Sequence, residues 1–476
     1  MSLNPLRNLP SVNDLIDSPP LRRLLGWLSR GTVVSAAQAL LDETRREALH
    51  AAAEMTLPDV ADLAERVARR VLESQLPALR SVINATGELF HPGLGRAPLA
   101  DEAIEEMGLI ARGYASVDLD LQSGRRRARS EPVEGLLVRL TGAEAALVVN
   151  NQTAAMLLAL AAHAAGREVV VARGQIVETE DGYRLPDIVS AAGAVLREVG
   201  TTNQTTLDDY RAALGPACGA ILAVEPIGYK VVGRVAGVPP DRLAALARQH
   251  RVPLIESAGY VAAIDLAPFG LPAVPRWSAV VARGADLVLA SGDKLLGGPQ
   301  CGVILGRRAA IDQLAAHPIA RAARCGAPVL AALAATLRLQ ENPETARRAL
   351  PILQLVTTSA ENLRCRAERM APQLAAARMI ASAEVQSGET PLDPAGVAGR
   401  LPTCRIVLRG TDQPAERLAA RLRAGAPSIL AGVADDRVVL DLRTVLPRQD
   451  LEIVEAVENL GGTPGEKNAG AADLSG

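Results

Sequence analysis

From Val82 onward, short apolar runs alternate with stretches of helical periodicity. The run Ala145–Val149 leads into a helix that begins near Gln152, and further apolar runs follow at βα spacing, at 168–171, 195–199, 220–224 and 252–255. Buried strands that alternate with helices predict an α/β domain with a mostly parallel sheet, covered by helices on both faces. Ligands of such sheets bind at the carboxyl ends of the strands. The residues that follow each run are therefore the candidates for a site.

The N-terminal region has a different pattern. Residues 5 to about 80 carry apolar positions at helical spacing, and Pro19, Pro20 and Pro58 divide them into separate helices. This stretch holds ten Arg against ten Asp plus Glu, so it is neutral overall. The pattern suits a helical module that binds a partner, and it suits an oligomerisation arm equally well.

The C-terminal part changes character again. Helices rich in Ala, Leu and Arg extend from about residue 328 to 377, and apolar runs at 404–408 and 437–442 predict the strands of a small α+β unit. We therefore predict four parts: a helical N-terminal domain (1–80), a large domain (81–320), a small C-terminal domain (321–462) and a disordered tail (463–476).

Composition and charge narrow the function classes. The chain has 51 Lys plus Arg against 53 Asp plus Glu, so any nucleic acid must be bound by local patches. Its five cysteines are scattered without the spacing of a metal site or a disulfide framework, which predicts no metal and a reducing cytoplasm. The start lacks a signal-peptide core, and there is no apolar run of about 20 residues, so we expect no membrane association.

Lys294 is the first candidate for chemistry. Only three lysines occur, Lys230, Lys294 and Lys467, and unlike arginine a lysine amine can lose its proton and attack a carbonyl. The apolar run 285–290 leads directly to this lysine, and Ser291 lies three residues before it. A lysine on a turn after a strand, with a nearby hydroxyl, is typical of a Schiff base with pyridoxal phosphate, whose phosphate the serine contacts. The alternative is a solvated lysine on a surface loop.

A second candidate follows the run Ala145–Val149. Asn151, Gln152 and Thr153 stand at the start of an Ala-rich helix, where unpaired N–H groups and the helix dipole favour an anion. These residues are candidates to bind a phosphate group. The same residue types also serve as ordinary helix N-caps, and the sequence alone leaves both interpretations open.

Arginines form a third group of candidates. Guanidinium groups bind phosphate and similar oxyanions through paired donors. Arg96 follows a Gly-Leu-Gly segment, and Arg321 and Arg324 follow a His-Pro pair. With 48 arginines in the chain, most must be solvated or ion-paired, and only these three stand out.

Several segments resemble those of a known family. In chain order they are LPSV (9–12), VINATG (82–87), LGR (94–96), TGAEAALVVNN (141–151), VGTTN (199–203), SGDKLLGGPQ (291–300) and LDLRTVLP (440–447). Together they resemble bacterial selenocysteine synthase, the L-seryl-tRNA(Sec) selenium transferase family, over residues 5 to about 460. The SGDKLLGGPQ segment is highly specific, and the others support it.

The resemblance implies a fold-type I pyridoxal phosphate enzyme, with Lys294 as the Schiff-base lysine and Asp293 assisting the chemistry. Family members convert serine esterified to tRNA(Sec) into selenocysteine, by loss of water and addition of selenium from selenophosphate. Arg96, Arg321 and Arg324 match positions expected to hold this anionic donor. The resemblance also implies that the N-terminal region docks seryl-tRNA(Sec), and that dimers join into a ring-shaped homo-oligomer with active sites between subunits.

Three segments depart from the family pattern: residues 91–93, 225–230 and 256–261. The last has Ser257 where the family has an aspartate that pairs with the pyridine nitrogen. A carboxylate there keeps the nitrogen protonated, which strengthens the cofactor as an electron sink. Either Glu256 takes this role by a shift of register, or the cofactor is a weaker electron sink. Neighbouring strand side chains point to opposite faces, which weighs against Glu256.

Two alternatives to the selenium transferase therefore stay open. A divergent paralogue would use pyridoxal phosphate as a lyase or transferase on a small amino acid substrate. A non-catalytic scaffold would only bind tRNA. The helical N-terminal region favours a tRNA partner, and the retained Ser291, Asp293 and Lys294 favour an enzyme.

Overall fold

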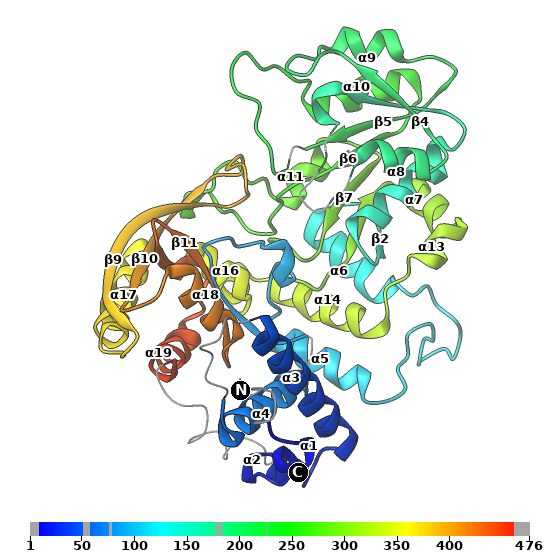
Figure 1. The fold of residues 1–476 in the computed structure, drawn as a ribbon. Helices are drawn as coiled ribbons and strands as arrows, with labels where there is room; N and C mark the ends of the chain where they lie inside the picture. Colours follow the sequence, from blue (N-terminus) through cyan, green and yellow to red (C-terminus); the bar gives the residue numbers. More distant parts are fainter. Residues whose placement is uncertain are drawn as a thin grey trace. The chain divides into compact units, whose positions relative to one another are not determined.

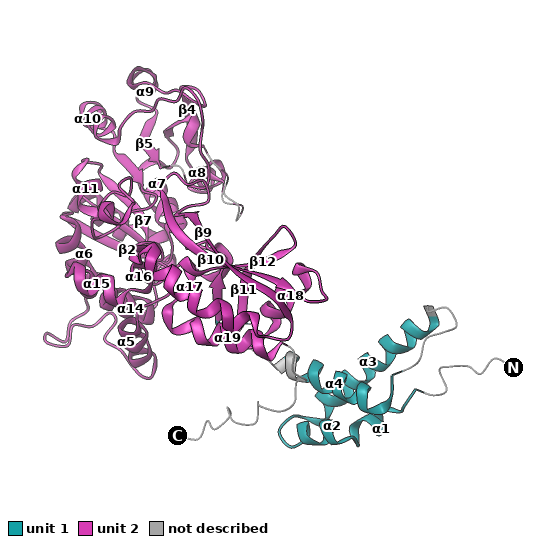
Figure 2. Cartoon of the chain, turned by 90° about the vertical axis from the view of Figure 1, so that its left-hand side faces the viewer, with its two compact units in different colours: residues 1–81 teal, residues 82–476 magenta. Residues whose placement is uncertain are grey.

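The computed structural model describes residues 9–50, 58–75, 79–176, 178, 182, 184–225 and 227–460. The chain divides into two compact units, residues 1–81 and 82–476 (Figure 2). The predicted tail at 463–476, which includes Lys467, lies outside the described residues. In the described part of the chain, no helix is both long and apolar enough to span a membrane.

The first unit is helical. It contains α1 (Val12–Ile16), α2 (Pro19–Leu24), α3 (Arg30–His50) and α4 (Val60–Gln75). Ser11 and Asp14 form a capping box at the start of α1, and the prolines of α2 occupy its first turn, where a missing N–H costs little. The apolar stripes of the helices meet in a core that includes Leu15, Leu63 and Val67. The unit therefore has a hydrophobic core of its own.

A seven-stranded sheet organises the larger part of the second unit (Figure 1). Its order is β2-β8-β7-β6-β5-β3-β4, and its strands are β2 (Ala145–Val149), β3 (Glu168–Ala172), β4 (Val195–Val199), β5 (Cys218–Val224), β6 (Leu254–Ser257), β7 (Leu287–Ser291) and β8 (Gly302–Gly306). Neighbouring strands are parallel except at β8, which runs antiparallel to both β2 and β7. The predicted α/β class with a mostly parallel sheet is confirmed.

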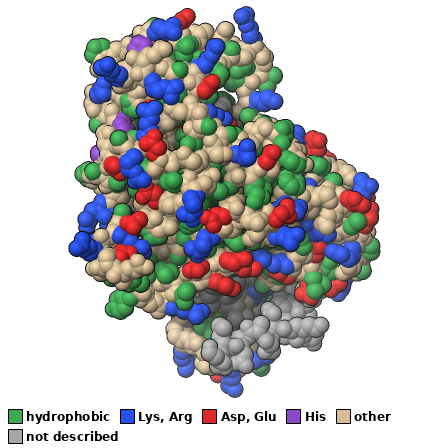
Figure 3. All heavy atoms as spheres, turned by 180° about the vertical axis from the view of Figure 1, so that it is seen from behind, with side chains coloured by type: hydrophobic (Ala, Val, Ile, Leu, Met, Phe, Trp, Pro, Cys, Tyr) green, Lys and Arg blue, Asp and Glu red, His purple; other side chains and the backbone are tan. Residues whose placement is uncertain are grey.

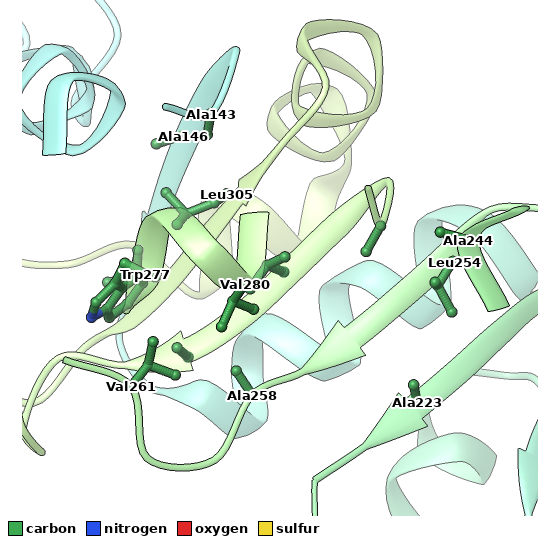
Figure 4. Packing of buried hydrophobic residues seen from close by; sticks show 14 of the residues in the cluster. Ala143, Ala146, Ala223, Ala244, Leu254, Ala258, Val261, Trp277, Val280 and Leu305 are labelled. Carbon is green, nitrogen blue, oxygen red and sulfur yellow. The ribbon is translucent and has the colours of Figure 1, made fainter. Parts of the chain in front are cut away.

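Helices cover both faces of this sheet. On one face lie α7 (Gln152–Ala164), α8 (Leu185–Ala191) and α12 (Arg308–Ala316); on the other lie α6 (Glu131–Thr141), α9 (Leu207–Ala213), α10 (Pro240–His250), α11 (Trp277–Ala282) and α14 (Ala327–Gln340). Strand side chains alternate between the two cores. Ile255 of β6 joins the core under α7, whereas Leu254 packs with Trp277 and Val280 in the core shown in Figure 4. This alternation decides which residues of β6 reach the site.

A second sheet has five strands in the order β1-β11-β12-β10-β9. They are β1 (Val82–Ala85), β9 (Ile380–Pro391), β10 (Arg400–Gly410), β11 (Ser428–Ala434) and β12 (Arg437–Asp441), and α17 (Ala360–Ala375), α18 (Ala415–Ala424) and α19 (Asp450–Asn459) pack against them. β1 pairs in parallel with β11, so the segment that begins the predicted large domain is an edge strand of the smaller sheet.

A further apolar cluster links the two sheets within this unit. It includes Phe90, Tyr260, Leu295, Leu353 and Leu392. The connecting helices α5 (Asp101–Ala111), α15 (Pro343–Ala349) and α16 (Pro351–Thr357) contribute to it, whereas α13 (Pro318–Ala322) packs against the core under α7. In this cluster Leu392, which follows β9 of the second sheet, packs with Tyr260 and Leu295, which follow β6 and β7 of the first sheet.

A buried ion pair supports the second sheet and gives a test of its stability. Arg366 on α17 donates to both carboxylate oxygens of Asp450, at 3.0 and 2.6 Å, and both residues are buried. Asp450→Ala leaves this guanidinium buried without its partner. We expect the free energy of unfolding to fall by about 3 kcal/mol, measured by denaturant titration.

The matched control is Glu384→Ala, which removes an exposed carboxylate 4.0 Å from Arg437. Surface pairs of this kind contribute less than about 1 kcal/mol. Equal losses in the two variants would contradict the role given to the buried pair.

Candidate active site

Six of the ten predicted site residues meet at one cavity of about 340 Å³. It lies where the carboxyl ends of β5, β6 and β7 approach the first turn of α7, as expected for an open α/β sheet. Of the residues singled out from the sequence, the structure brings six to its walls: Arg96, Asn151, Gln152, Thr153, Ser291 and Lys294.

Lys294 stands on a tight turn that follows β7. Gly292 N donates to the Cys301 carbonyl, and Gly298 N donates to the Gly292 carbonyl, each at 2.9 Å. A Cβ at Gly292 would collide with Cys301 Sγ and with the backbone, so this position requires glycine. The turn holds the lysine with 7% of its surface exposed and its Nζ 5.0 Å from the centre of the Tyr260 ring. A buried lysine that lines a cavity argues against the solvated surface loop.

Asp293 connects the lysine turn to the Arg96 loop. Its carboxylate accepts a hydrogen bond from Ser291 Oγ and lies 3.4 Å from Arg96 Nη1, while its carbonyl accepts from Ala97 N at 3.1 Å. Asp293 is 4% exposed. Arg96 has a φ of 65°, an uncommon backbone conformation for a residue with a side chain, and such strain occurs often at functional sites.

The first turn of α7 forms the opposite wall. Asn151 Oδ1 accepts from Ala154 N at 2.7 Å, so the Asn151 side chain is the N-cap of the helix. Gln152 Nε2 donates to Ser257 Oγ at 3.3 Å and to the Ala258 carbonyl at 3.1 Å. Thr153 is exposed toward the cavity it lines. The two interpretations of this segment therefore coexist: a side chain caps the helix, and the helix N-terminus faces the cavity.

These groups fit pyridoxal phosphate by their chemistry. An amine at one wall can hold an aldehyde, and a helix N-terminus with a serine hydroxyl at another can hold a phosphate. The cavity volume of about 340 Å³ lies within the range of small-molecule sites.

Glu256 and Ser257 separate to opposite faces of β6. Ser257 is in regular register with Val224 and Leu289 and lines the cavity. The Glu256 carboxylate instead pairs with Arg283 at 2.5 Å and lines a second cavity, of about 420 Å³. The expectation that Glu256 binds the cofactor is therefore corrected. A shift of register would break the regular pairing of β6 with both neighbours.

The comparisons with known proteins match this site and fold. A sequence model of L-seryl-tRNA selenium transferase matches residues 82–446, and one of the selenocysteine synthase N-terminal region matches residues 6–45. The chain belongs to the L-seryl-tRNA selenium transferase family. It is 39% identical over 462 residues to the L-seryl-tRNA(Sec) selenium transferase of Geobacter sulfurreducens, covering 95% of this chain and 98% of that one.

A second relative agrees with this assignment, and a solved structure agrees with the fold. The Klebsiella pneumoniae L-seryl-tRNA(Sec) selenium transferase is 40% identical over 446 residues, which are 91% of this chain and 95% of that one. Among solved structures, a D-glucosaminate-6-phosphate ammonia-lyase superposes with a TM-score of 0.58 at 24% identity, covering 82% of this chain and 97% of that one. The predicted fold-type I architecture is confirmed.

Two arginines expected at the selenium donor do not reach this cavity. Arg321 on α13 and Arg324 just after it are exposed, and neither lines the cavity of the same chain. Arg324 pairs by a backbone bridge with Val149. A hydrogen bond from Arg129 lowers the pKa of Asp118, and the charge of Arg324 lowers it further. The resemblance to the family predicted that these arginines bind the selenium donor. In this chain they do not line the cavity that contains Lys294.

Among the lining residues that the sequence did not single out, three bear on the chemistry of the cavity: Phe90, Glu225 and Tyr260. Tyr260 is 7% exposed, its ring lies 5.2 Å from that of Phe90, and burial raises its pKa. Two of the three lie in segments that depart from the family pattern, 225–230 and 256–261. That departure was the available signal, because substitutions that gather around one cavity indicate a change in the site.

Glu256→Gln tests the placement of Glu256. Burial raises the pKa of this carboxyl, so the folded protein keeps its proton to higher pH than the unfolded chain does. The contribution of Glu256 to the free energy of unfolding is therefore full below its pKa in the unfolded chain, about 4.3. It is lost as the pH rises through the higher pKa of the folded protein. We expect the variant to lose that part of the pH dependence, measured by thermal unfolding across pH, with unchanged affinity for pyridoxal phosphate. A large loss of cofactor affinity would mean that Glu256 does contact the cofactor.

Proposed function

We infer that this protein catalyses the pyridoxal phosphate-dependent conversion of seryl-tRNA(Sec) to selenocysteinyl-tRNA(Sec). The observation that carries this inference is family membership over nearly the whole chain, together with Lys294, Ser291 and Asp293 assembled at one buried cavity. A scaffold that only bound tRNA would have no use for a buried amine at such a place.

Pyridoxal phosphate is the cofactor, and the residues that hold it are those of the cavity. The Lys294 amine would hold its aldehyde, while Ser291 and the first turn of α7 would hold its phosphate. When bound, the cofactor withdraws electrons from the substrate's α-carbon. Tyr260 and Phe90 close the cavity beside the lysine and exclude water.

The protein's own groups then move the protons. Lys294, which lines the cavity, would be the base that takes the α-proton of the seryl group. The β-hydroxyl would leave as water after it gains a proton from the solvent. The selenium of selenophosphate would then form a bond to the β-carbon, and Lys294 would return its proton to the α-carbon. Water would cleave the phosphorus–selenium bond, so that inorganic phosphate leaves. Asp293 lies beside this lysine in the chain and carries the negative charge that orients Arg96.

The selenium donor is an anion, and Arg96 is the cation at the cavity that suits it. Its guanidinium lies 3.4 Å from Asp293 and is part of the cavity wall. Guanidinium binds phosphate-like oxyanions through paired donors. Selenophosphate bound there would bring its selenium toward the substrate's β-carbon.

The helical unit at residues 1–81 is proposed to dock the tRNA in the cytoplasm. The family model that matches residues 6–45 supports a role for this unit that is specific to the family. On the face shown in Figure 3, basic side chains are interspersed with acidic ones, in keeping with a net charge of −2. Attraction to the tRNA phosphates therefore depends on local groups of arginines rather than on the total charge.

A homo-oligomer is proposed to complete the site. Arg321 and Arg324 are exposed and lie outside the cavity of their own chain, so a partner subunit would have to supply them. A ring of dimers with sites between subunits would meet this need.

Mixing inactive chains tests whether the arginines act across subunits. One chain would carry Lys294→Arg and the other Arg321→Ala with Arg324→Ala. If the arginines serve the partner's cavity, co-expression should restore roughly a quarter of native activity, since half of randomly formed pairs are mixed and each has one complete site. Separately purified variants are the control. No activity in the mixture, with mixed oligomers present, would show that each chain uses its own arginines.

The direct test of the function supplies purified protein with pyridoxal phosphate, seryl-tRNA(Sec) and selenophosphate. We expect selenocysteinyl-tRNA(Sec) as the product, identified by mass spectrometry of the released amino acid. Free serine is the control substrate. Turnover of free serine without turnover of the tRNA substrate would favour the small-molecule enzyme, and a protein that binds tRNA but takes up no cofactor would be a scaffold.

A further inference from the structure

Ser257 and Gln152 form a polar pair inside the cavity that the proposed reaction does not yet use. Ser257 ends β6, is 6% exposed, and lies beside the strand that leads to Lys294. Gln152, in the first turn of α7, donates to it across the cavity wall at 3.3 Å. The pair therefore joins the phosphate-binding wall to the end of the sheet.

The hydrogen bonds of this pair fix the direction of the serine hydroxyl. Gln152 Nε2 also donates to the Ala258 carbonyl at 3.1 Å, and a carbonyl can only accept, so the amide nitrogen must face Ser257. Ser257 Oγ is then an acceptor toward Gln152. Its own hydrogen is available to donate to another group at the cavity. The Ser257 hydroxyl is therefore better suited to a ligand atom that accepts a hydrogen bond than to one that donates it.

The described carboxylates around this cavity already have partners. Of those that line it, Glu88 lies 3.9 Å from His91, and Glu178 lies 3.4 Å from Arg184. Glu256 lies on the other face of β6 and pairs with Arg283. Asp293 accepts from Ser291 and pairs with Arg96. Glu225 follows β5 and also lines the cavity, but its Oε2 already accepts from Gly259 N at 2.9 Å.

The ring of pyridoxal phosphate has one acceptor that fits. Its nitrogen lies across the ring from the carbon that carries the aldehyde, so it points away from Lys294 when the lysine holds that aldehyde. A protonated nitrogen would be a donor and would require a carboxylate; an unprotonated nitrogen is an acceptor. Ser257 at the end of β6, with its hydrogen available, suits the second state.

We propose that this protein holds the pyridine nitrogen of its cofactor unprotonated, through a hydrogen bond donated by Ser257, with Gln152 as the residue that positions the serine. This rests on the proposed function for the presence of the cofactor. The neutral ring is a weaker electron sink, so it disfavours a long-lived carbanion. The site then suits reactions in which a β-substituent leaves as the α-proton is removed, and it suppresses racemisation and transamination of the tRNA-bound amino acid.

The test is the ¹⁵N NMR signal of pyridoxal phosphate labelled at the ring nitrogen and bound to the full-length protein. We expect the wild-type signal at the position of an unprotonated pyridine nitrogen. In Ser257→Asp it should move upfield to the position of a pyridinium. In Ser257→Ala it should move downfield, because the hydrogen bond is lost without gain of a proton.

Gln152→Leu and Glu225→Gln separate positioning from charge. Gln152→Leu should shift the signal in the same direction as Ser257→Ala but by less, since the serine remains and only its orientation is lost. Glu225→Gln should leave the signal in place. A pyridinium signal in the wild-type protein overturns the proposal, and its loss in Glu225→Gln would assign the proton to Glu225 instead.

The measurement needs neither tRNA nor selenophosphate, so it is independent of the proposed reaction. A protein that shows the expected signal but makes no selenocysteinyl-tRNA would refute the function and leave this inference standing. If Ser257→Asp fails to fold, as judged by circular dichroism, the wild-type and Ser257→Ala spectra still decide the question. A protein that binds no cofactor refutes both.

Discussion

Lys294→Arg will remove the cofactor-derived visible absorption of the protein and lower its activity by more than about 10⁴-fold, the scale seen when a covalent catalytic group is lost. The reason is chemical: guanidinium keeps a positive charge but cannot form the bond to the aldehyde, and it cannot accept the α-proton. Lys294 is 7% exposed and lines the cavity, so no solvent-exposed lysine can replace it there. Absorption spectra and tRNA conversion measured on the same preparation provide the check.

Lys230→Arg is the matched control, because Lys230 is one of the three lysines and is exposed on the loop after β5. It should keep both the absorption and the activity. Borohydride reduction followed by peptide mapping should place the modified lysine at position 294 in the native protein. A modified peptide that contains Lys230, or a yellow and active Lys294→Arg protein, would overturn the assignment.

The core of the large sheet could be predicted from the sequence because its strands are continuous apolar runs. The runs at 145–149 and 195–199 correspond to β2 and β4, and the run at 220–224 lies within β5. The runs of β2 and β5 are typical of strands buried on both faces, whereas β4, at the edge of the sheet, has a charged centre and is mostly exposed. The lysine turn was predictable for the same reason, since it follows one of these runs.

Other strands gave weaker signals. β9 spans Ile380–Pro391, but most of its side chains are partly or fully exposed, so its sequence lacks a clear apolar pattern. β1 is only four residues long and pairs with β11, which lies far along the chain. No local pattern reports a partner more than 300 residues away, so the sequence could not assign this strand to the smaller sheet.

The candidate site also has features that the sequence predicts and features that it does not. Strand parity alone argued that Glu256 and Ser257 face opposite sides, and the structure agrees. The partner of each could not be predicted, because Arg283 and Gln152 come from distant parts of the chain. Arg321 and Arg324 do not line the cavity of their own chain. The role proposed for them requires a partner subunit, and no local sequence pattern predicts how subunits assemble.

Asp293→Asn will lower the rate of the chemical step by about 10²- to 10⁴-fold, the range for loss of a group that assists proton transfer, while the protein still binds pyridoxal phosphate. The native carboxylate accepts from Ser291 Oγ and lies 3.4 Å from Arg96 Nη1. An amide in its place keeps the shape but removes the charge, so Arg96 loses its ion-pair partner and the environment of the Lys294 amine changes. Single-turnover measurements on seryl-tRNA(Sec) report the chemical step separately from tRNA binding.

Two further variants show how the Asp293 charge acts. Asp312→Asn removes an exposed carboxylate on α12, 4.0 Å from Arg308, and should leave the rate unchanged. Arg96→Lys should raise the concentration of selenophosphate needed for half-maximal rate, since an ammonium lacks the paired donors, but it should leave water elimination from the seryl group largely intact. If Asp293→Asn impaired only the use of selenophosphate, its effect would pass through Arg96 alone. Impaired elimination without any selenophosphate present would instead place the Asp293 charge beside the proton that Lys294 moves.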